Sequence, residues 1–393
     1  MPPNDSTAVH TEPAAAVAGA NDAAPRFGGY VNPNIAAVEP YTPGLSPEDV
    51  VRRLGEVPSP IVKLASGENP LGPSPKGVEG VRAGMAELML YPDWTAARLR
   101  DAVADHVGLT PEHVVCGAGE TEIIGGIVRA FAEPGGEIVM ARPTFPVYHQ
   151  YAQAEGRAVR FADGGEGLDV GPGPMLETVS ERTRVAFVTS PHNPTGRCWA
   201  LEEVAGLCDR IPHALVVLDE AYIHFSDRPS GFAILGGHPN LIVLRTFSKA
   251  YGMAGLRVGY GVADPQVIGL LMRAKPTWNL GPLQVLGAAA ALADDEHVTR
   301  TAALVREGRR RIEEAVASQP KLRVVDGSEA NYVLLRIVDP ELDSGQVFEH
   351  FLRRGLVIKD GTVSYLGLGD RHVRIDAPPP AVLARVEAAI RAL

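Results

Sequence analysis

The sequence predicts an α/β protein, with a large domain built on a mainly parallel sheet and a smaller α+β domain. Its 393 residues are enough for two or three domains. Short apolar runs alternate with longer helix-compatible stretches, which is typical of a parallel sheet whose strands are joined by helices. Most of these runs are continuously apolar, which indicates strands covered on both faces.

Seven such runs predict a seven-stranded sheet. They are residues 114–116, 137–142, 158–162, 185–190, 215–221, 241–247 and 258–263. An Ala-rich helix over 283–293 follows the last run, so we expect the large domain to span residues 76–294.

The pattern changes after residue 294. A charged helix over 298–318 precedes a strand over 332–338, a helix over 344–354, two strands over 356–359 and 373–375, and a helix after three prolines. Residues 295–393 are therefore expected to form the smaller domain, with residues 36–75 as its N-terminal part. Residues 1–35, rich in Ala, Pro, Asn and Asp, predict a disordered arm.

Composition disfavours several classes of function. The net charge is −10 and no long basic run is present, so nucleic acid is not an expected partner. No apolar stretch approaches the ~20 residues of a membrane helix. Cys116, Cys198 and Cys208 show no metal-ligand spacing and cannot form a disulfide framework. We expect no metal site and, since no basic residue precedes Arg26 to start a signal peptide, a reducing, cytoplasmic compartment.

One of the six lysines, Lys249, lies in a segment suited to amine chemistry. It follows the run 241–247 and begins the sequence Lys-Ala-Tyr-Gly-Met-Ala-Gly-Leu-Arg, which ends at Arg257. A reactive lysine needs a partly desolvated site, and a forked guanidinium suits a phosphate. Taken alone, the segment also fits a surface lysine beside a turn.

Three further loops follow apolar runs. Asp219 ends one run, at the strand end where open α/β sheets bind ligands, and a carboxylate there can hold a pyridinium nitrogen. Tyr222 can reach a phenolic oxygen of the same ring, Asn193 lies in a Pro-rich turn, and the Gly-rich turn 117–122 aims N–H groups at an anion. Each loop alone also fits an ordinary cap or turn. Together with Lys249 they supply the groups that a pyridoxal phosphate site requires.

The order and spacing of these loops resemble the aspartate aminotransferase superfamily of fold type I pyridoxal phosphate enzymes. The chain is most similar to the histidinol-phosphate aminotransferase family, from Tyr41 to the C-terminus. The resemblance implies pyridoxal 5'-phosphate as cofactor, Lys249 as its Schiff-base lysine and Asp219 as the partner of its ring nitrogen. It further implies cofactor contacts from Tyr91, Glu120, Thr121, Phe145, Asn193, Tyr222, Thr246, Ser248 and Arg257.

The resemblance also implies a substrate side and a partner subunit. Tyr41, Lys359 and Arg374 match positions that border the substrate, and Arg374 matches an arginine that grips a carboxylate or phosphate. Tyr91 matches a tyrosine that reaches the phosphate of the neighbouring subunit, which implies a homodimer with shared sites.

Departures from the family pattern lie around the phosphate and the substrate. The turn reads Gly-Ala-Gly-Glu-Thr-Glu where relatives usually have Gly-Asn-Gly-Ser-Asp-Glu. Because an inward Glu120 carboxylate would repel a phosphate, we expect the backbone N–H groups of Glu120 and Thr121 to be the donors. Lys359 replaces an arginine common in the family, residues 376–380 read Asp-Ala-Pro-Pro-Pro, and Gly67 replaces an asparagine.

We therefore expect an aminotransferase that moves an amino group between an amino acid or amino phosphate and a 2-oxo acid, with Lys249 as the base for the α-proton. Histidinol phosphate, an aromatic amino acid and a specialised amino acid stay open as amino substrates. The alternative is a decarboxylase or a cyclising eliminase of the same fold. A DNA-binding regulator is disfavoured, because residues 1–35 offer no DNA-binding module.

Overall fold

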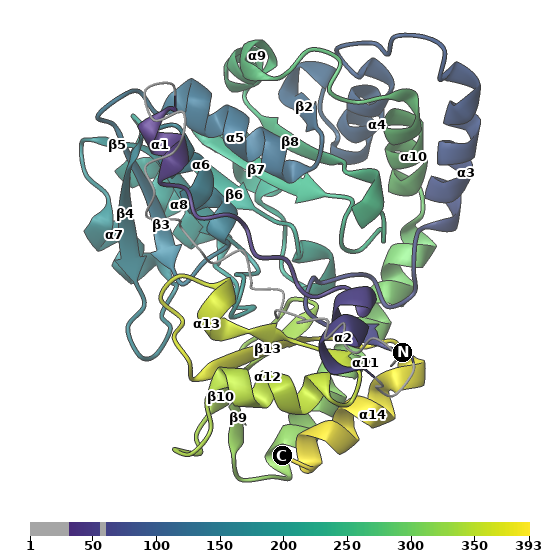
Figure 1. Ribbon diagram of the computed structural model, residues 1–393. Helices are drawn as coiled ribbons and strands as arrows, with labels where there is room; N and C mark the ends of the chain where they lie inside the picture. Colours follow the sequence, from purple (N-terminus) through teal and green to yellow (C-terminus); the bar gives the residue numbers. More distant parts are fainter. Residues whose placement is uncertain (1–30, 56–59) are drawn as a thin grey trace, which may run out of the picture.

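A seven-stranded sheet forms the centre of the large domain in the computed structural model, which describes residues 31–55 and 60–393 (Figure 1). The strand order is β2-β8-β7-β6-β5-β3-β4, and only β8 runs antiparallel to its neighbours. This confirms the predicted α/β fold with a mainly parallel sheet. The strands are β2 (Val114–Gly117), β3 (Glu137–Arg142), β4 (Ala158–Asp163), β5 (Thr183–Thr189), β6 (Leu215–Asp219), β7 (Leu241–Thr246) and β8 (Gly259–Ala263).

Helices cover both faces of this sheet, as continuously apolar strands require. One face packs against α5 (Glu120–Phe131), α6 (Pro146–Ala154) and α9 (Pro265–Ala274). The opposite side packs against α7 (Pro172–Thr178), α8 (Leu201–Arg210), α4 (Ala97–Val107) and α10 (Pro282–Leu292), and α3 (Pro75–Gly84) lies on α10. Short 3-10 helices are η1 (Met85–Glu87), η2 (Pro111–His113), η3 (Ile223–Phe225), η4 (Gly231–Gly237) and η5 (Ala254–Leu256).

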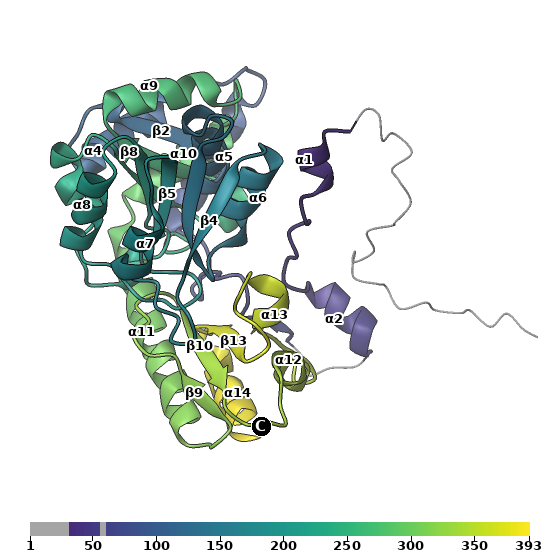
Figure 2. The same cartoon turned by 90° about the vertical axis from the view of Figure 1, so that its left-hand side faces the viewer.

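The smaller domain carries an antiparallel sheet of order β12-β13-β10-β9. Its strands are β9 (Leu322–Val324), β10 (Tyr332–Ile337), β12 (Lys359–Asp360) and β13 (His372–Asp376). The helices α11 (Asp295–Ala317), α12 (Ser344–Leu352) and α14 (Pro380–Arg391) pack on one face of it, and α13 (Gly361–Ser364) lies at its edge. The other face looks toward the large domain (Figure 2).

Two features of the small domain differ from the sequence-based expectation. The strand expected over 356–359 divides into β11 (Leu356–Val357), which pairs with β1 (Val62–Lys63), and β12, which pairs with β13. The short strand β9 was not expected. Both differences arise because pairing partners distant in sequence decide where a short strand begins and ends.

The N-terminal segment also differs. Helix α1 (Pro33–Ala36) lies against α6, and Gln153 Nε2 donates to the Ala37 carbonyl at 2.6 Å (Figure 2). The expected disorder therefore does not extend to residue 35, and the chain first follows the large domain. From α2 (Pro47–Leu54) it packs on the small domain, through Val50. Residues 1–30 of the expected arm lie outside the described residues. Among the described helices, none has the length and apolar character needed to span a bilayer.

Candidate active site

The expected site residues meet at the carboxyl ends of β5, β6 and β7. These three parallel strands are neighbours in the sheet, so the loops that follow them lie side by side. Those loops carry Asn193, Asp219 and Lys249 respectively. Strand β13 of the small domain places Arg374 opposite them, within hydrogen-bonding distance of Asn193. The site therefore lies between the two domains.

Lys249 occupies a partly buried position under the N-terminal segment of the small domain. Its Nζ donates to the Ser66 carbonyl at 2.6 Å and lies 5.5 Å from the centre of the Tyr222 ring. Burial, reinforced by the nearby Arg374 guanidinium, lowers the pKa of Lys249 to about 8. Gly67 has a φ of 66° and a Cβ there would lie 3.0 Å from Lys249 Nζ, so a side chain at this position would crowd the amine.

Asp219 is buried at the end of β6 and is held by two donors. Its Oδ1 accepts from the Ala221 N–H at 2.9 Å, and the Tyr148 hydroxyl donates to its Oδ2. Tyr148 also contacts the Thr189 hydroxyl at 3.0 Å. Burial raises the pKa of Asp219, although these hydrogen bonds favour its ionised form. Asp219 is thus a buried carboxylate held in one orientation, and it can accept one further hydrogen bond.

The Glu120 side chain points inward, toward Asp219. It is 8% exposed, its carboxyl lies within hydrogen-bonding reach of the Asp219 carboxyl, and its Oε1 makes no hydrogen bond to the described part of the chain. Burial first, and then the Asp219 charge, raises the pKa of Glu120 well above its usual range. The raised pKa favours a proton shared by the two carboxyls. The carboxyl therefore faces Asp219, and donation from the Glu120 and Thr121 backbone N–H groups to a phosphate stays a prediction.

A polar cradle forms beside β7 and the start of α5. Ser248 Oγ lies 3.0 Å from Thr246 Oγ1 and 3.5 Å from Arg257 Nη1. Arg257 adopts the left-handed backbone conformation with a φ of 57°, which is unusual for a residue with a side chain. Helix α5 begins at Glu120 without a side-chain cap, so its first N–H groups and its positive end face this cradle. The arrangement suits an anion.

Gly119 allows the cradle to close. Its φ is 77°, and a Cβ at this position would lie 2.4 Å from Arg257 Nη2 and 3.5 Å from Thr121 Oγ1. The absence of a side chain therefore brings the guanidinium up to the first turn of α5.

The substrate side is built around Arg374, which is 3% exposed. Its Nη1 donates to Asn193 Oδ1 and to the Tyr365 hydroxyl, both at 2.9 Å, and its Nη2 donates to Asp376 Oδ1 at 2.8 Å. Its Nε makes no hydrogen bond within the described ranges. The guanidinium also lies 4.2 Å from the centre of the Tyr332 ring. Arg374 is thus held rigidly, with one donor unused.

Lys359 lies beside Arg374 and under Tyr41. It is 7% exposed, and its Nζ lies 5.6 Å from the centre of the Tyr41 ring. Burial, together with Arg374, lowers the pKa of Lys359 to about 8. Within residues 31–55 and 60–393, no carboxylate forms an ion pair with it. A second cation therefore lies next to Arg374.

The remaining expected residues divide into two groups. Tyr222 is buried, and burial raises its pKa, so its hydroxyl remains a neutral donor. Phe145 packs edge-on against Tyr148, with ring centres 5.6 Å apart, and Tyr148 is the residue that donates to Asp219. Tyr91, by contrast, is 83% exposed and lies outside this cluster, with its ring tilted against Trp278 at a centre-to-centre distance of 4.9 Å.

Several residues of the cluster were not expected as functional. Tyr148 lies three positions after Phe145, and this helical spacing was a usable signal. Tyr365 and Asp376 become visible only in the structure, because they lie directly after the edge helix α13 and at the end of β13. No local pattern distinguishes them from ordinary polar residues.

Comparison with known proteins gives consistent matches. The family model for aminotransferase class I and II matches residues 59–393. The chain is 37% identical to "Histidinol-phosphate aminotransferase 2" of Pseudomonas fluorescens, over 90% of this chain and 95% of that protein. It is 38% identical to "Histidinol-phosphate aminotransferase" of Akkermansia muciniphila, over 91% and 96%. The crystal structure of histidinol-phosphate aminotransferase from Sinorhizobium meliloti in complex with pyridoxal-5'-phosphate has a TM-score of 0.81, at 25% identity and 92% and 97% coverage.

Proposed function

The chain belongs to the aminotransferase class I and II family, and from this premise we propose that it transfers the amino group of histidinol phosphate to a 2-oxo acid. It is a pyridoxal-phosphate-dependent aminotransferase, which moves an amino group between an amino acid or amino phosphate and a 2-oxo acid. The decarboxylase and eliminase alternative is not favoured by these relatives. The proposal concerns the amino substrate, the roles of the site residues and the partner subunit.

The pairing of Lys359 with Arg374 is the observation that carries the substrate proposal. Lys359 is nearly buried and meets no carboxylate in the part of the chain that the structure describes, so its charge is uncompensated there. Arg374, which is ion-paired with Asp376, adds a guanidinium cation beside the Lys359 ammonium. A phosphate carries close to two negative charges near neutral pH and suits two adjacent cations better than one carboxylate does. Relatives named histidinol-phosphate aminotransferases support this assignment.

The residues fit pyridoxal phosphate. Ser248, Thr246, Arg257 and the start of α5 form an anion cradle that a Cβ at Gly119 would fill. Asp219 offers a buried carboxylate for a ring nitrogen, and Lys249 offers an amine whose pKa is lowered to about 8. Asn193 and Tyr222 border the same space. When bound, the cofactor supplies an electron sink for the carbanion left by the α-proton.

Each residue then has a separate task. Lys249 Nζ takes the α-proton and returns it, because its lowered pKa leaves much of the amine uncharged near pH 8. Asp219 keeps a ring N–H in place, and the Tyr148 hydroxyl keeps Asp219 ionised and oriented. The anion cradle fixes the phosphate end, while Arg374 and Lys359 orient the amine.

We further infer a homodimer. The segment around Tyr91 exposes several large apolar side chains, including Met89 at 88%, Leu90 at 63% and Tyr91 at 83%. A contiguous apolar surface of this kind is typical of a protein interface. A second copy that covers it would bring Tyr91 next to another subunit.

Steady-state kinetics with histidinol phosphate and histidinol, with 2-oxoglutarate as acceptor, tests the substrate proposal. We expect Lys359→Gln to raise KM for histidinol phosphate by about tenfold, since a charge-assisted hydrogen bond is worth roughly 1.5–3 kcal/mol. Lys359→Arg should retain the affinity, and Lys76→Gln, on the exposed start of α3, is the matched control. Equal losses of activity with both amines, or no turnover of histidinol phosphate by the unsubstituted protein, would contradict the proposal.

A further inference from the structure

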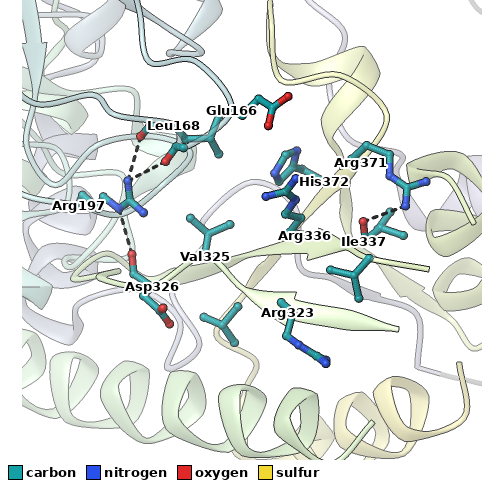
Figure 3. Close-up of a pocket in the computed structure, with 13 residues that line it drawn as sticks. Glu166, Leu168, Arg197, Arg323, Val325, Asp326, Arg336, Ile337, Arg371 and His372 are labelled. Atoms are coloured by element: carbon teal, nitrogen blue, oxygen red, sulfur yellow. Dashed lines mark hydrogen bonds between the residues drawn. The ribbon is translucent and has the colours of Figure 1, made fainter. Parts of the chain in front are cut away.

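A pocket lies between the two domains, apart from the active-site cluster. Its volume is about 490 Å³, and its lining comes from the loop at residues 166–168, from Arg197, from β9 and β10, and from the start of β13 (Figure 3). None of the residues that hold Lys249, Asp219 or Arg374 lines it. The proposed aminotransferase reaction does not use this pocket.

Three basic side chains form a row across one face of the small-domain sheet. Arg323 of β9 lies directly opposite Arg336 of β10, and Arg336 lies directly opposite His372 of β13. Directly opposed residues on adjacent strands point to the same face, and like charges in this position destabilise a sheet. Burial lowers the pKa of His372, so the like-charge contact is the one between the exposed Arg323 and Arg336, and an anion bound beside them would relieve it.

Two further guanidinium groups flank the row. Arg197 donates to the Asp326 carbonyl at 3.1 Å and to the Leu168 carbonyl at 3.0 Å, and Arg371 donates to the Ile337 carbonyl at 3.0 Å (Figure 3). These carbonyls hold the guanidinium groups in place but leave their positive charges uncompensated.

The balance of charge around the pocket is positive. Arg197, Arg323, Arg336 and Arg371 line it, against two carboxylates, Glu166 and Asp326. In the ion pairs found over residues 31–55 and 60–393, none of these four arginines is a member, although arginines elsewhere pair with carboxylates repeatedly. A chain with a net charge of −10 has thus gathered unpaired guanidinium groups in one concave place.

We propose that this pocket binds a small multivalent anion, bearing phosphate or carboxylate groups, that bridges the two domains. Arg197 contributes from the large domain, and Arg323, Arg336 and His372 contribute from the small domain. Planar guanidinium groups bind phosphate and carboxylate oxygens in pairs, which suits a ligand with several such groups. The volume exceeds that of a single inorganic ion and accommodates a compact organic anion or a pyrophosphate.

The bound anion would touch both elements that carry the substrate-side contact. His372 precedes Arg374 by two residues on β13, so both side chains lie on the same face of that strand. Arg197 follows Asn193 by four residues in the loop after β5. Arg374 and Asn193 are joined by the 2.9 Å hydrogen bond described above. Occupancy of the pocket therefore supports the relative placement of these two residues.

Isothermal titration of the cofactor-loaded protein with pyrophosphate, and separately with citrate, at constant ionic strength tests the proposal. We expect one anion per chain beyond any bound at the substrate side, and an affinity about tenfold weaker in Arg336→Gln and in Arg323→Gln. Arg310→Gln is the matched control, because Arg310 is exposed on α11 and pairs with Glu307 and Glu314. Tighter binding of pyrophosphate would indicate a phosphate ligand, and tighter binding of citrate would indicate a carboxylate ligand.

Thermal unfolding supplies a second readout. Without a multivalent anion, Arg336→Gln should unfold at the same or a higher temperature than the unsubstituted protein, since one opposed charge is gone. With the anion bound, the unsubstituted protein should unfold at a higher temperature than Arg336→Gln. Unchanged affinity in both Arg336→Gln and Arg323→Gln would overturn the proposal, as would loss of all anion binding in Lys359→Gln, which would place the anion at the substrate side.

Discussion

The contact between the buried Glu120 and Asp219 carboxyls should make folding stability depend on pH, and Glu120→Gln should remove that dependence. Glu120→Gln keeps the volume of the side chain and replaces a carboxyl that faces Asp219 with a neutral amide. The amide can donate to Asp219, whereas a second carboxylate can only repel it unless a proton lies between them. The substitution therefore removes a buried like-charge contact without creating a cavity.

The direction of the pH effect follows from the raised pKa. The usual pKa of Glu120 is 4.5, and burial and Asp219 raise it well above that value in the folded protein. The folded state thus binds a proton that the unfolded state has released, so the free energy of unfolding falls as pH rises above 4.5 toward the folded pKa. The slope is at most about 1.4 kcal/mol per pH unit. Between about pH 5.5 and 7.5, Glu120→Gln should gain up to about 2.7 kcal/mol relative to the unsubstituted protein.

Urea unfolding of the cofactor-free protein at these two pH values measures the difference. Glu137→Gln is a control of opposite sign. Burial raises the pKa of Glu137, but Ser180, Arg160 and Arg182 lower it further, so its net shift is downward. Its stabilisation is present above the unfolded pKa and is lost as pH falls below it, so this control is also measured at pH 4, and Glu137→Gln should be destabilised at pH 7.5 relative to pH 4. If the stability advantage of Glu120→Gln were independent of pH, the shared proton between Glu120 and Asp219 would be refuted.

Four further predictions concern the cofactor site and the apolar segment. Lys249→Ala should abolish transamination. Residual turnover in a sample purified through an affinity tag, free of host aminotransferases, would exclude Lys249 as the base. Tyr148→Phe should lower the free energy of unfolding by about 1–3 kcal/mol in urea, because Asp219 loses a buried donor; an unchanged value would mean that Asp219 is satisfied without it. Gly119→Ala should displace Arg257 and weaken pyridoxal phosphate binding by about tenfold in a fluorescence titration, whereas Gly255→Ala, with open space around it, should not. Met89→Asp should convert a dimer to monomers in analytical ultracentrifugation, and an unchanged sedimentation coefficient would exclude this surface as the interface.

Much of the large domain was predictable because its signals are local. Buried parallel strands read as continuous apolar runs, and all seven expected runs are strands of one sheet. The residues after them were predictable for the same reason, since chain order in successive β-α units fixes which loops meet at the sheet edge. Asn193, Asp219 and Lys249 accordingly follow three strands that are neighbours in the sheet.

The sequence by itself therefore determined the fold class, the cofactor-type loops and the lysine on which the chemistry depends. Tertiary structure decided which partners those residues meet. Tyr148 donates to Asp219 across 71 positions of the sequence, and Glu120 faces Asp219 across 99 positions. Strand register decides that Arg323, Arg336 and His372 lie opposite one another. Side-chain charge and burial at such points depend on contacts between distant segments. Local periodicity carries no information about those contacts.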